Sequence, residues 1–167
     1  MILIPRLLGL GINTIIRAAR ITDVAVIADF NLRIALETEQ RRLDPERVRL
    51  GVAALLADAS KGVYFVAEVE GEGAPEIVGQ TLLTYEWSDW RNGNFWWIQS
   101  VYVAEGFRNR GVFRSLFHHI HALAKAKPDV CGLRLYMDHD NHRARQAYER
   151  LGLKQTGYQV FEVDFVL

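Results

Sequence analysis

The chain has 167 residues, half of them hydrophobic, and its 20 basic and 20 acidic side chains give a formal net charge of zero. This length suits one domain with a single core, and the balanced charge gives no support for a nucleic-acid or anionic-membrane partner. No apolar run approaches the roughly 20 residues of a membrane-spanning helix, and a lone cysteine, Cys131, excludes an internal disulfide and fits a reducing, cytoplasmic location.

The first 14 residues are predicted to be a short N-terminal extension. The opening stretch is apolar, but Arg6 interrupts it and no small-residue cleavage site follows, so a secretory signal is not expected. Residues 15–167 are predicted to form one domain, because no linker, repeat or low-complexity tract divides them.

The N-terminal third predicts one strand and two helices. The strand is expected near Thr14–Ala19, and Thr22 or Asp23 then caps a helix. Its buried face consists of Ile27, Phe30 and Ile34. A second helix begins at Asp44-Pro45-Glu46, which supplies an N-cap, a proline at the first helical position and an acidic first turn. The apolar face of this helix is Val48, Val52, Leu55 and Leu56.

The middle of the chain predicts a β-hairpin and then a central strand. Two β-rich runs, Val63–Val69 and Glu76–Glu86, flank a glycine-containing turn, and Asn92-Gly93 forms a second turn before Trp96–Val103. After a helix with its apolar face between Phe113 and Ala124, further strands are expected at Gly132–Met137 and Thr156–Phe165. This order predicts an α+β domain with a mixed sheet, antiparallel early and parallel across the helix after Gly111.

The junction between the central strand and the following helix is unusually basic. Arg108, Arg110 and Gly111 lie in the loop, and Arg114 lies in the first helical turn. Cations at a helix start are unfavourable, since that end already carries partial positive charge and free N–H groups, unless an anion binds there. The junction is therefore a candidate phosphate site, although solvated arginines at an ordinary turn would explain the loop alone equally well.

Two motifs resemble the GNAT superfamily of acyl-CoA-dependent N-acetyltransferases. The loop from Arg108 to Phe113 matches the pyrophosphate motif Arg/Gln-x-x-Gly-x-Gly/Ala, except that Phe113 replaces the small last residue. Asn141, Ala144 and Tyr148, followed by the pair Gly152-Leu153, match the closing motif. The resemblance implies the GNAT fold, with a mainly antiparallel sheet and flanking helices, from about residue 15 to residue 165.

The resemblance also implies that acetyl-CoA is the co-substrate. Its thioester arm would bind the backbone of the central strand at Val101, Tyr102 and Val103, and the remaining contacts would come from the loop and the closing motif. Those residues are Arg108, Asn109, Arg110, Gly111, Val112, Phe113, Arg114, Asn141 and Tyr148. No metal site is expected, because the histidines at 118, 119 and 121 have no carboxylate or cysteine at ligand spacing.

The catalytic residues are expected to be Tyr148 and Glu86. Tyr148 falls where the family places a phenol near the cofactor sulfur, which implies a general acid, although a tyrosine packed for its ring area is the alternative. Glu86 is a candidate base close to four tryptophans, and an exposed glutamate paired with Arg91 is an equal alternative. Asp89, Glu37 and ordered water remain open as other bases.

The sequence thus favours direct acetyl transfer to a primary amine. The neutral overall charge, together with tryptophans that could line an acceptor pocket, favours the amine of a small molecule. A protein N-terminus or lysine as the acceptor, and a non-catalytic acyl-CoA-binding module, are the alternatives. A homodimer is left open by the sequence.

Overall fold

The computed structural model of the chain describes residues 12–71 and 73–165. The chain divides into two compact units, and the boundary along the chain lies between Tyr136 and Met137. The first unit contains a five-stranded sheet with three α-helices, and the second contains the fourth α-helix. No helix in these residues is long and apolar enough to cross a membrane. Most of the expected N-terminal extension, residues 1–11, lies outside the described residues.

The sheet follows the order of the chain. Its five strands are β1 (Ile15–Ala18), β2 (Val63–Val69), β3 (Glu76–Ser88), β4 (Gly93–Val103) and β5 (Val130–Leu135). Their spatial order is β1-β2-β3-β4-β5. The first four pair antiparallel, and β5 pairs parallel to β4. This confirms the mixed, mainly antiparallel sheet and the position of its parallel crossover.

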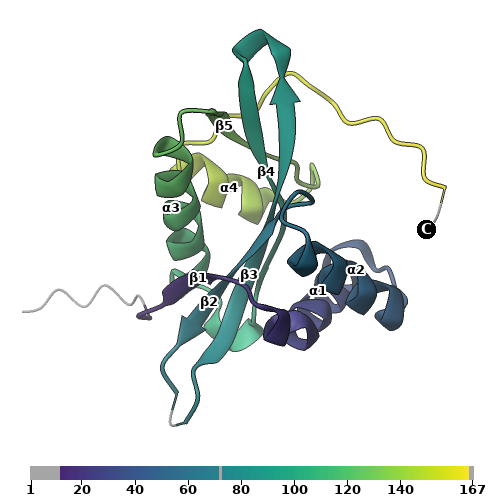
Figure 1. Ribbon diagram of the computed structural model, residues 1–167, viewed down its shortest axis with the longest axis vertical. Helices are drawn as coiled ribbons and strands as arrows, with labels where there is room; N and C mark the ends of the chain where they lie inside the picture. Colours follow the sequence, from purple (N-terminus) through teal and green to yellow (C-terminus); the bar gives the residue numbers. More distant parts are fainter. Residues whose placement is uncertain (1–11, 72, 166–167) are drawn as a thin grey trace, which may run out of the picture. The chain divides into compact units, whose positions relative to one another are not determined.

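The helices of the first unit cover both faces of the sheet (Figure 1). Helices α1 (Val24–Glu39) and α2 (Pro45–Ala57) lie on one side, and α3 (Val112–Lys125) lies on the other. Ile27 and Val52 from α1 and α2 pack with Tyr64 and Val66 of β2 in one buried cluster. Leu116 and Ile120 of α3 are also buried, as the helical spacing predicts.

Side chains cap α2 and α4 at their N-termini, but Asp23, which stands at the N-cap of α1, makes no capping hydrogen bond with its side chain. Asp44 accepts a hydrogen bond from the Arg47 amide at 2.7 Å, with Pro45 at the first helical position. In the second unit, Asn141 accepts one from the Ala144 amide at 3.0 Å at the start of α4 (His142–Arg150). Helix α4 ends at Arg150, and Gly152, two residues farther along the chain, has a left-handed φ of 87°. The Gly152 and Leu153 amides then donate to the last-turn carbonyls of Glu149 and Tyr148, as in a Schellman motif.

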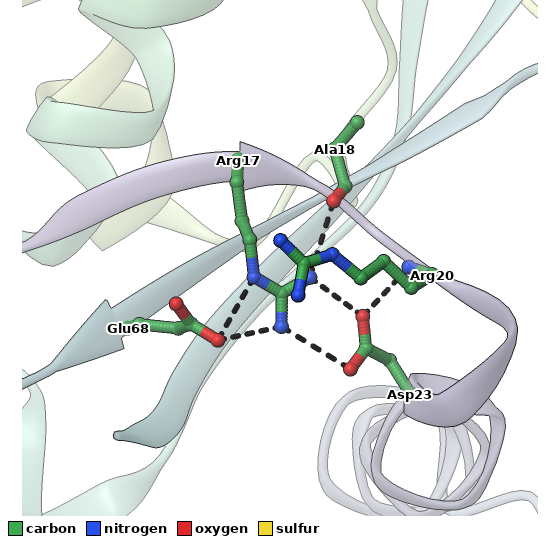
Figure 2. Close-up of polar contacts among 5 residues, drawn as sticks. All are labelled: Arg17, Ala18, Arg20, Asp23 and Glu68. Atoms are coloured by element: carbon green, nitrogen blue, oxygen red, sulfur yellow. Dashed lines mark hydrogen bonds and ion pairs between the residues drawn. The ribbon is translucent and has the colours of Figure 1, made fainter. Parts of the chain in front are cut away.

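A charged cluster joins β1, β2 and the start of α1 (Figure 2). The Arg17 guanidinium donates to Glu68 on one side and to Asp23 on the other, at 2.5 Å and 2.7 Å. Asp23 also accepts from the Arg20 backbone amide at 2.7 Å. Burial raises the pKa of Asp23, but the hydrogen bonds from Arg17 and Arg20 outweigh it, so that pKa lies below its ordinary value.

The predicted last strand, Thr156–Phe165, is wrong. The structure forms no strand there, and its larger apolar side chains (Tyr158, Val160, Phe161, Val163 and Phe165) are exposed. Alternation of apolar and polar residues gives a segment the propensity for a strand, but a strand also needs a neighbour to complete its backbone hydrogen bonds. Thr156–Phe165 pairs with no strand of the described residues.

Candidate active site

Half of one edge of β4 is open. The parallel pairing with β5 runs from Asn94 opposite Val130 to Ile98 opposite Leu135, whereas β4 continues to Val103. The pairing with β3 shifts register between Thr81 and Leu83, so two residues of β4, Gln99 and Ser100, lie opposite one residue of β3. This β-bulge lies where β5 ends. Among the described residues, no strand pairs with this edge of β4 beyond Ile98.

The register determines which backbone groups of β4 face the open edge. The Ala104 amide donates to the Val78 carbonyl at 2.9 Å, and Tyr102 lies opposite Gln80. Hydrogen-bonded and non-hydrogen-bonded pairs alternate in an antiparallel ladder, so Tyr102 exchanges hydrogen bonds with β3. Val101 and Val103 then direct their N–H and C=O groups away from β3, toward the open edge.

The open edge leads directly into the basic loop and the N-terminus of α3. Asn109 and Gly111 both have left-handed φ values, of 64° and 85°, and Gly111 is the N-cap of α3. Glycine has no side chain to cap the helix. The Arg114 guanidinium folds back over this end, with Nη2 3.4 Å from the position that a Cβ on Gly111 would occupy. Arg110 is exposed beside it. Partial positive charge from the helix and two guanidinium groups make this end attractive to a phosphate.

Helix α3 begins in close contact with the sheet at the same corner. Val112 is buried, and its Cγ1 lies 3.0 Å from where a Cβ on Gly79 of β3 would be. Phe113, the departure from the family motif, packs its half-buried ring on Phe117 at a centroid distance of 6.3 Å. The larger side chain is therefore accommodated along the helix itself.

Arg108 has protein partners on three sides. Its Nη2 donates to Glu37 of α1 at 2.6 Å, its Nε donates to the Val103 carbonyl at 2.9 Å, and its guanidinium lies over the Tyr102 ring at 5.4 Å. The sequence motif predicts a phosphate contact for this arginine and does not reveal these partners. The role of Arg108 in cofactor binding stays a prediction.

Glu86 lies in a polar cluster on the sheet face that carries the side chains of Trp97 and Arg134. Its carboxylate accepts hydrogen bonds from Trp97 Nε1 and from Arg134 Nη1, the latter at 2.5 Å. Arg134, rather than the expected Arg91, is thus its ion-pair partner, and Arg91 lies over the Phe95 ring. The side chain is 40% exposed, so the carboxylate is accessible from solvent.

A second set of hydrogen bonds continues this cluster to the end of β5. The Gln99 side chain donates to Thr84 at 2.7 Å and accepts from the Tyr136 hydroxyl at 2.8 Å. The rings of Trp97 and Tyr136 lie 5.9 Å apart. No motif in the sequence marks Arg134, Gln99 or Tyr136 as site residues. A charged residue in the otherwise apolar run Val130–Leu135 was the one signal that could have marked Arg134.

The four tryptophans differ widely in burial. Only Trp96 is buried, Trp97 is partly exposed, and Trp87 and Trp90 are 59% and 85% exposed. Of the four, Trp97 is the one that donates a hydrogen bond to Glu86.

Tyr148 and Asn141 belong to the second unit. Tyr148 is half-buried on α4, and burial raises the pKa of its phenol, which keeps the hydroxyl protonated at neutral pH. A protonated phenol is the form that a general acid requires. In the same unit Asp138, His139 and Asp140 come within 4.8 Å of one another, but all three are exposed and nothing else in the described residues marks them as a metal site.

The family comparison matches most of this architecture. The model of the Acetyltransferase (GNAT) family matches residues 27–153, which include the sheet from β2 onward, the basic loop and α4. The chain belongs to the GNAT acetyltransferase family. It is accordingly an acyltransferase, and the family it belongs to uses acetyl-CoA.

Solved structures agree with this assignment. A possible acetyltransferase from Clostridium difficile 630 is 42% identical, with a TM-score of 0.83, over 92% of this chain and 99% of that chain. The ribosomal-protein-alanine N-acetyltransferase from Brucella melitensis biovar Abortus 2308 is 16% identical, with a TM-score of 0.70, over 92% and 100%. An aminoglycoside N-acetyltransferase in complex with CoA, AAC(6')-Iy, is also 16% identical, with a TM-score of 0.72, over 97% and 99%. These last two show a shared fold. No curated protein matches the chain in sequence.

Proposed function

We propose that this acetyltransferase uses acetyl-CoA to acetylate a primary amine of a small molecule directly, without a covalent enzyme intermediate. One observation carries the proposal: the open edge of β4 ends at the basic N-terminus of α3. An extended chain carrying amides and ending in phosphates needs such a combination, because its amides pair with a strand edge and its phosphates bind at a helix N-terminus.

The residues of the edge and the loop fit acetyl-CoA in a defined direction. The phosphates would bind near Arg110, Gly111 and Arg114, and the pantetheine arm would run along Val103 and Val101 toward the end of β5. The thioester then lies nearer Val101 than Val103. Tyr102 directs its own N–H and C=O to β3, so its contribution would come from its side chain. Asn141 caps α4, and its proposed role is to hold Tyr148 on that helix.

The chemistry divides among three groups of this chain. Acetyl-CoA supplies an acetyl thioester, and the amine of the acceptor forms the new C–N bond as the C–S bond breaks. The Val101 N–H would stabilise the negative charge that develops on the thioester oxygen. Glu86, directly or through water, would take the proton that the amine loses. Tyr148 would give its hydroxyl proton to the departing thiolate, and the proton held by Glu86 would pass through solvent to the Tyr148 phenolate, so that both groups regain their starting forms.

The acceptor would approach the half-exposed cluster around Glu86. Trp97 and Tyr136 offer aromatic surface, and Gln99 and Thr84 offer polar groups, a mixture that suits a small amine with both apolar and polar parts. We further propose that residues 15–167 act as one catalytic domain in the cytoplasm. Cys131, the only cysteine, agrees with a reducing compartment.

The test combines cofactor binding with turnover. Calorimetry should show that acetyl-CoA binds the wild-type protein, and that Arg110→Ala combined with Arg114→Ala raises the Kd at least tenfold, since charge-assisted hydrogen bonds are worth about 1.5–3 kcal/mol each. Arg41→Ala, an exposed arginine outside the loop, is the control and should leave the Kd unchanged. Release of CoA thiol in the presence of a panel of small primary amines should then identify the acceptor.

Two results would contradict the proposal. If acetyl-CoA does not bind, or binds equally well to the double variant, the phosphate site is misassigned. If acetyl-CoA binds tightly but no amine, whether a small molecule, a peptide N-terminus or a lysine, accelerates thiol release, the chain is a binding module.

A further inference from the structure

A three-residue network connects the end of α1 to the open edge of β4. Glu37 of α1 uses one carboxylate oxygen to accept from the Tyr102 hydroxyl at 3.0 Å and the other to accept from Arg108 at 2.6 Å. Arg108 in turn donates through Nε to the Val103 carbonyl at 2.9 Å. The partners come from a helix, a strand and the basic loop, so the network holds together elements that are distant in sequence.

The network is well fixed at its centre. The Tyr102 ring is buried against Phe30 of α1, with centroids 4.9 Å apart, and it carries the Arg108 guanidinium on its face. Burial, and then the hydrogen bond to the Glu37 carboxylate, raises the pKa of the Tyr102 phenol, so the hydroxyl remains a donor at neutral pH. Both oxygens of Glu37 are therefore directed by protonated partners. With both oxygens held in this way, Glu37 is better suited to orienting its partners than to acting as the alternative base considered from the sequence.

The network changes what the open edge offers to a ligand. Val103 directs its carbonyl to the open edge, and Arg108 already occupies that carbonyl. The groups that remain on the edge are the N–H and C=O of Val101 and the N–H of Val103. An amide that pairs with this edge is therefore favoured to donate to Val101, because at Val103 it would have to share the carbonyl with the Arg108 guanidinium. This preference selects the pairing alignment that uses Val101 over the one shifted by two residues to Val103.

We infer that Glu37 is a positioning residue: it holds Arg108 against the Val103 carbonyl and so sets the alignment of the acetyl-CoA arm on β4. This inference rests on the proposed function, because it takes acetyl-CoA as the ligand of the edge. If the Glu37 contacts only hold α1 against β4, their loss should lower the stability of the fold and leave the affinity for acetyl-CoA unchanged. If Glu37 positions Arg108, its loss should also weaken acetyl-CoA binding, and this effect should require Arg108.

The experiment measures acetyl-CoA binding by calorimetry in single and double variants, together with the unfolding midpoint. Glu37→Ala should raise the Kd of acetyl-CoA about tenfold, as expected for loss of one charge-assisted hydrogen bond. Glu37→Gln keeps an oxygen for Arg108 and should recover part of that loss. Glu39→Ala, an exposed glutamate at the end of the same helix, is the matched control and should bind as the wild type does.

A double-mutant cycle shows whether Glu37 acts through Arg108. In the Arg108→Ala background, Glu37→Ala should cause no further change in Kd, because the group that it positions is already absent. With a cognate amine, the KM for acetyl-CoA should rise in Glu37→Ala while the KM for the amine stays within about twofold of the wild-type value.

The outcomes separate this inference from the proposed function. If the wild type binds acetyl-CoA and Glu37→Ala binds as Glu39→Ala does, the inference is overturned and the proposed function stands. The inference is also overturned if Glu37→Ala weakens binding equally with and without Arg108, or if Glu37→Ala changes only the unfolding midpoint. If the wild type does not bind acetyl-CoA, the proposed function fails, and the inference fails with it.

Discussion

The sharpest test of the mechanism is to remove a single backbone N–H from the open edge. Val101→Pro deletes the N–H that faces this edge and changes no hydrogen bond to β3, because Val101 occupies a non-hydrogen-bonded position opposite Thr81. The main structural cost is the fixed proline φ near −65°. We therefore expect the variant to fold, with a moderately lower unfolding midpoint.

The expected loss follows from the task of this N–H. If it stabilises the developing oxyanion, its removal should slow the chemical step about 10²–10³-fold, as for other single donors at such sites. Val103→Pro is the matched control: it deletes the next N–H on the same edge, about 7 Å along the strand and farther from the thioester. This variant should weaken acetyl-CoA binding but slow the bound reaction much less.

The assay is single-turnover acetylation of the amine found in the panel, with the acetyl-CoA Kd measured by calorimetry on the same preparations. Single-turnover rates are needed because product release often limits kcat. A Val101→Pro variant that is folded, binds acetyl-CoA and reacts at the wild-type rate would refute both the orientation of the edge and the assignment of its N–H. Equal slowing in both proline variants would refute the direction of the cofactor along β4.

Three further predictions concern side chains. Asp23→Asn should lower the free energy of unfolding by roughly 1–3 kcal/mol, between the values for exposed and buried ion pairs, whereas the exposed Asp29→Asn should cost much less in the same urea titration. The folded pKa of Asp23 lies below its ordinary value of 3.8, so the ionised carboxylate stabilises the fold above pH 3.8. This stabilisation is lost as the pH falls through the folded pKa. The free energies of unfolding of the two variants should therefore converge in acid. If Glu86 is the base, Glu86→Gln should lower kcat/KM by about 10²–10⁴-fold and leave the Kd of acetyl-CoA unchanged. A similar loss in Asp89→Asn, with Glu86→Gln active, would instead assign the role of base to Asp89. Tyr148→Phe should slow single-turnover acetylation about 10²–10⁴-fold without weakening acetyl-CoA binding; a lower unfolding midpoint with a normal rate would show a packing role only.

Features that depend on adjacent residues were predictable from the sequence. Asp44-Pro45 caps α2 as expected. Asn141 caps α4 in the same way, and Gly111 and Gly152 adopt the left-handed conformations that glycine favours. The basic loop also lies at the helix start where its motif places it. In each case the signal and the structure that it specifies lie within a few residues of each other.

Features that depend on distant residues were not predictable. Arg108 meets Glu37 across 71 positions, and Arg134 meets Glu86 across 48. Such pairs are fixed by the register of the strands and the docking of a helix, and one sequence carries no direct signal of either. The same limit explains the error at Thr156–Phe165, where alternation gave the propensity for a strand but not its partner.

The order of the strands has a consequence for how this protein is made. Each of the first four strands pairs with its neighbour in the chain, so residues up to Val103 can assemble with α1 and α2 as they leave the ribosome. Strand β5 can join only after α3 has been synthesised and has returned the chain to the sheet. Until then the whole outer edge of β4 lacks a partner, and an unpaired strand edge is a template for association with other nascent chains. The strand that is proposed to hold the cofactor is therefore also open to misassembly during synthesis.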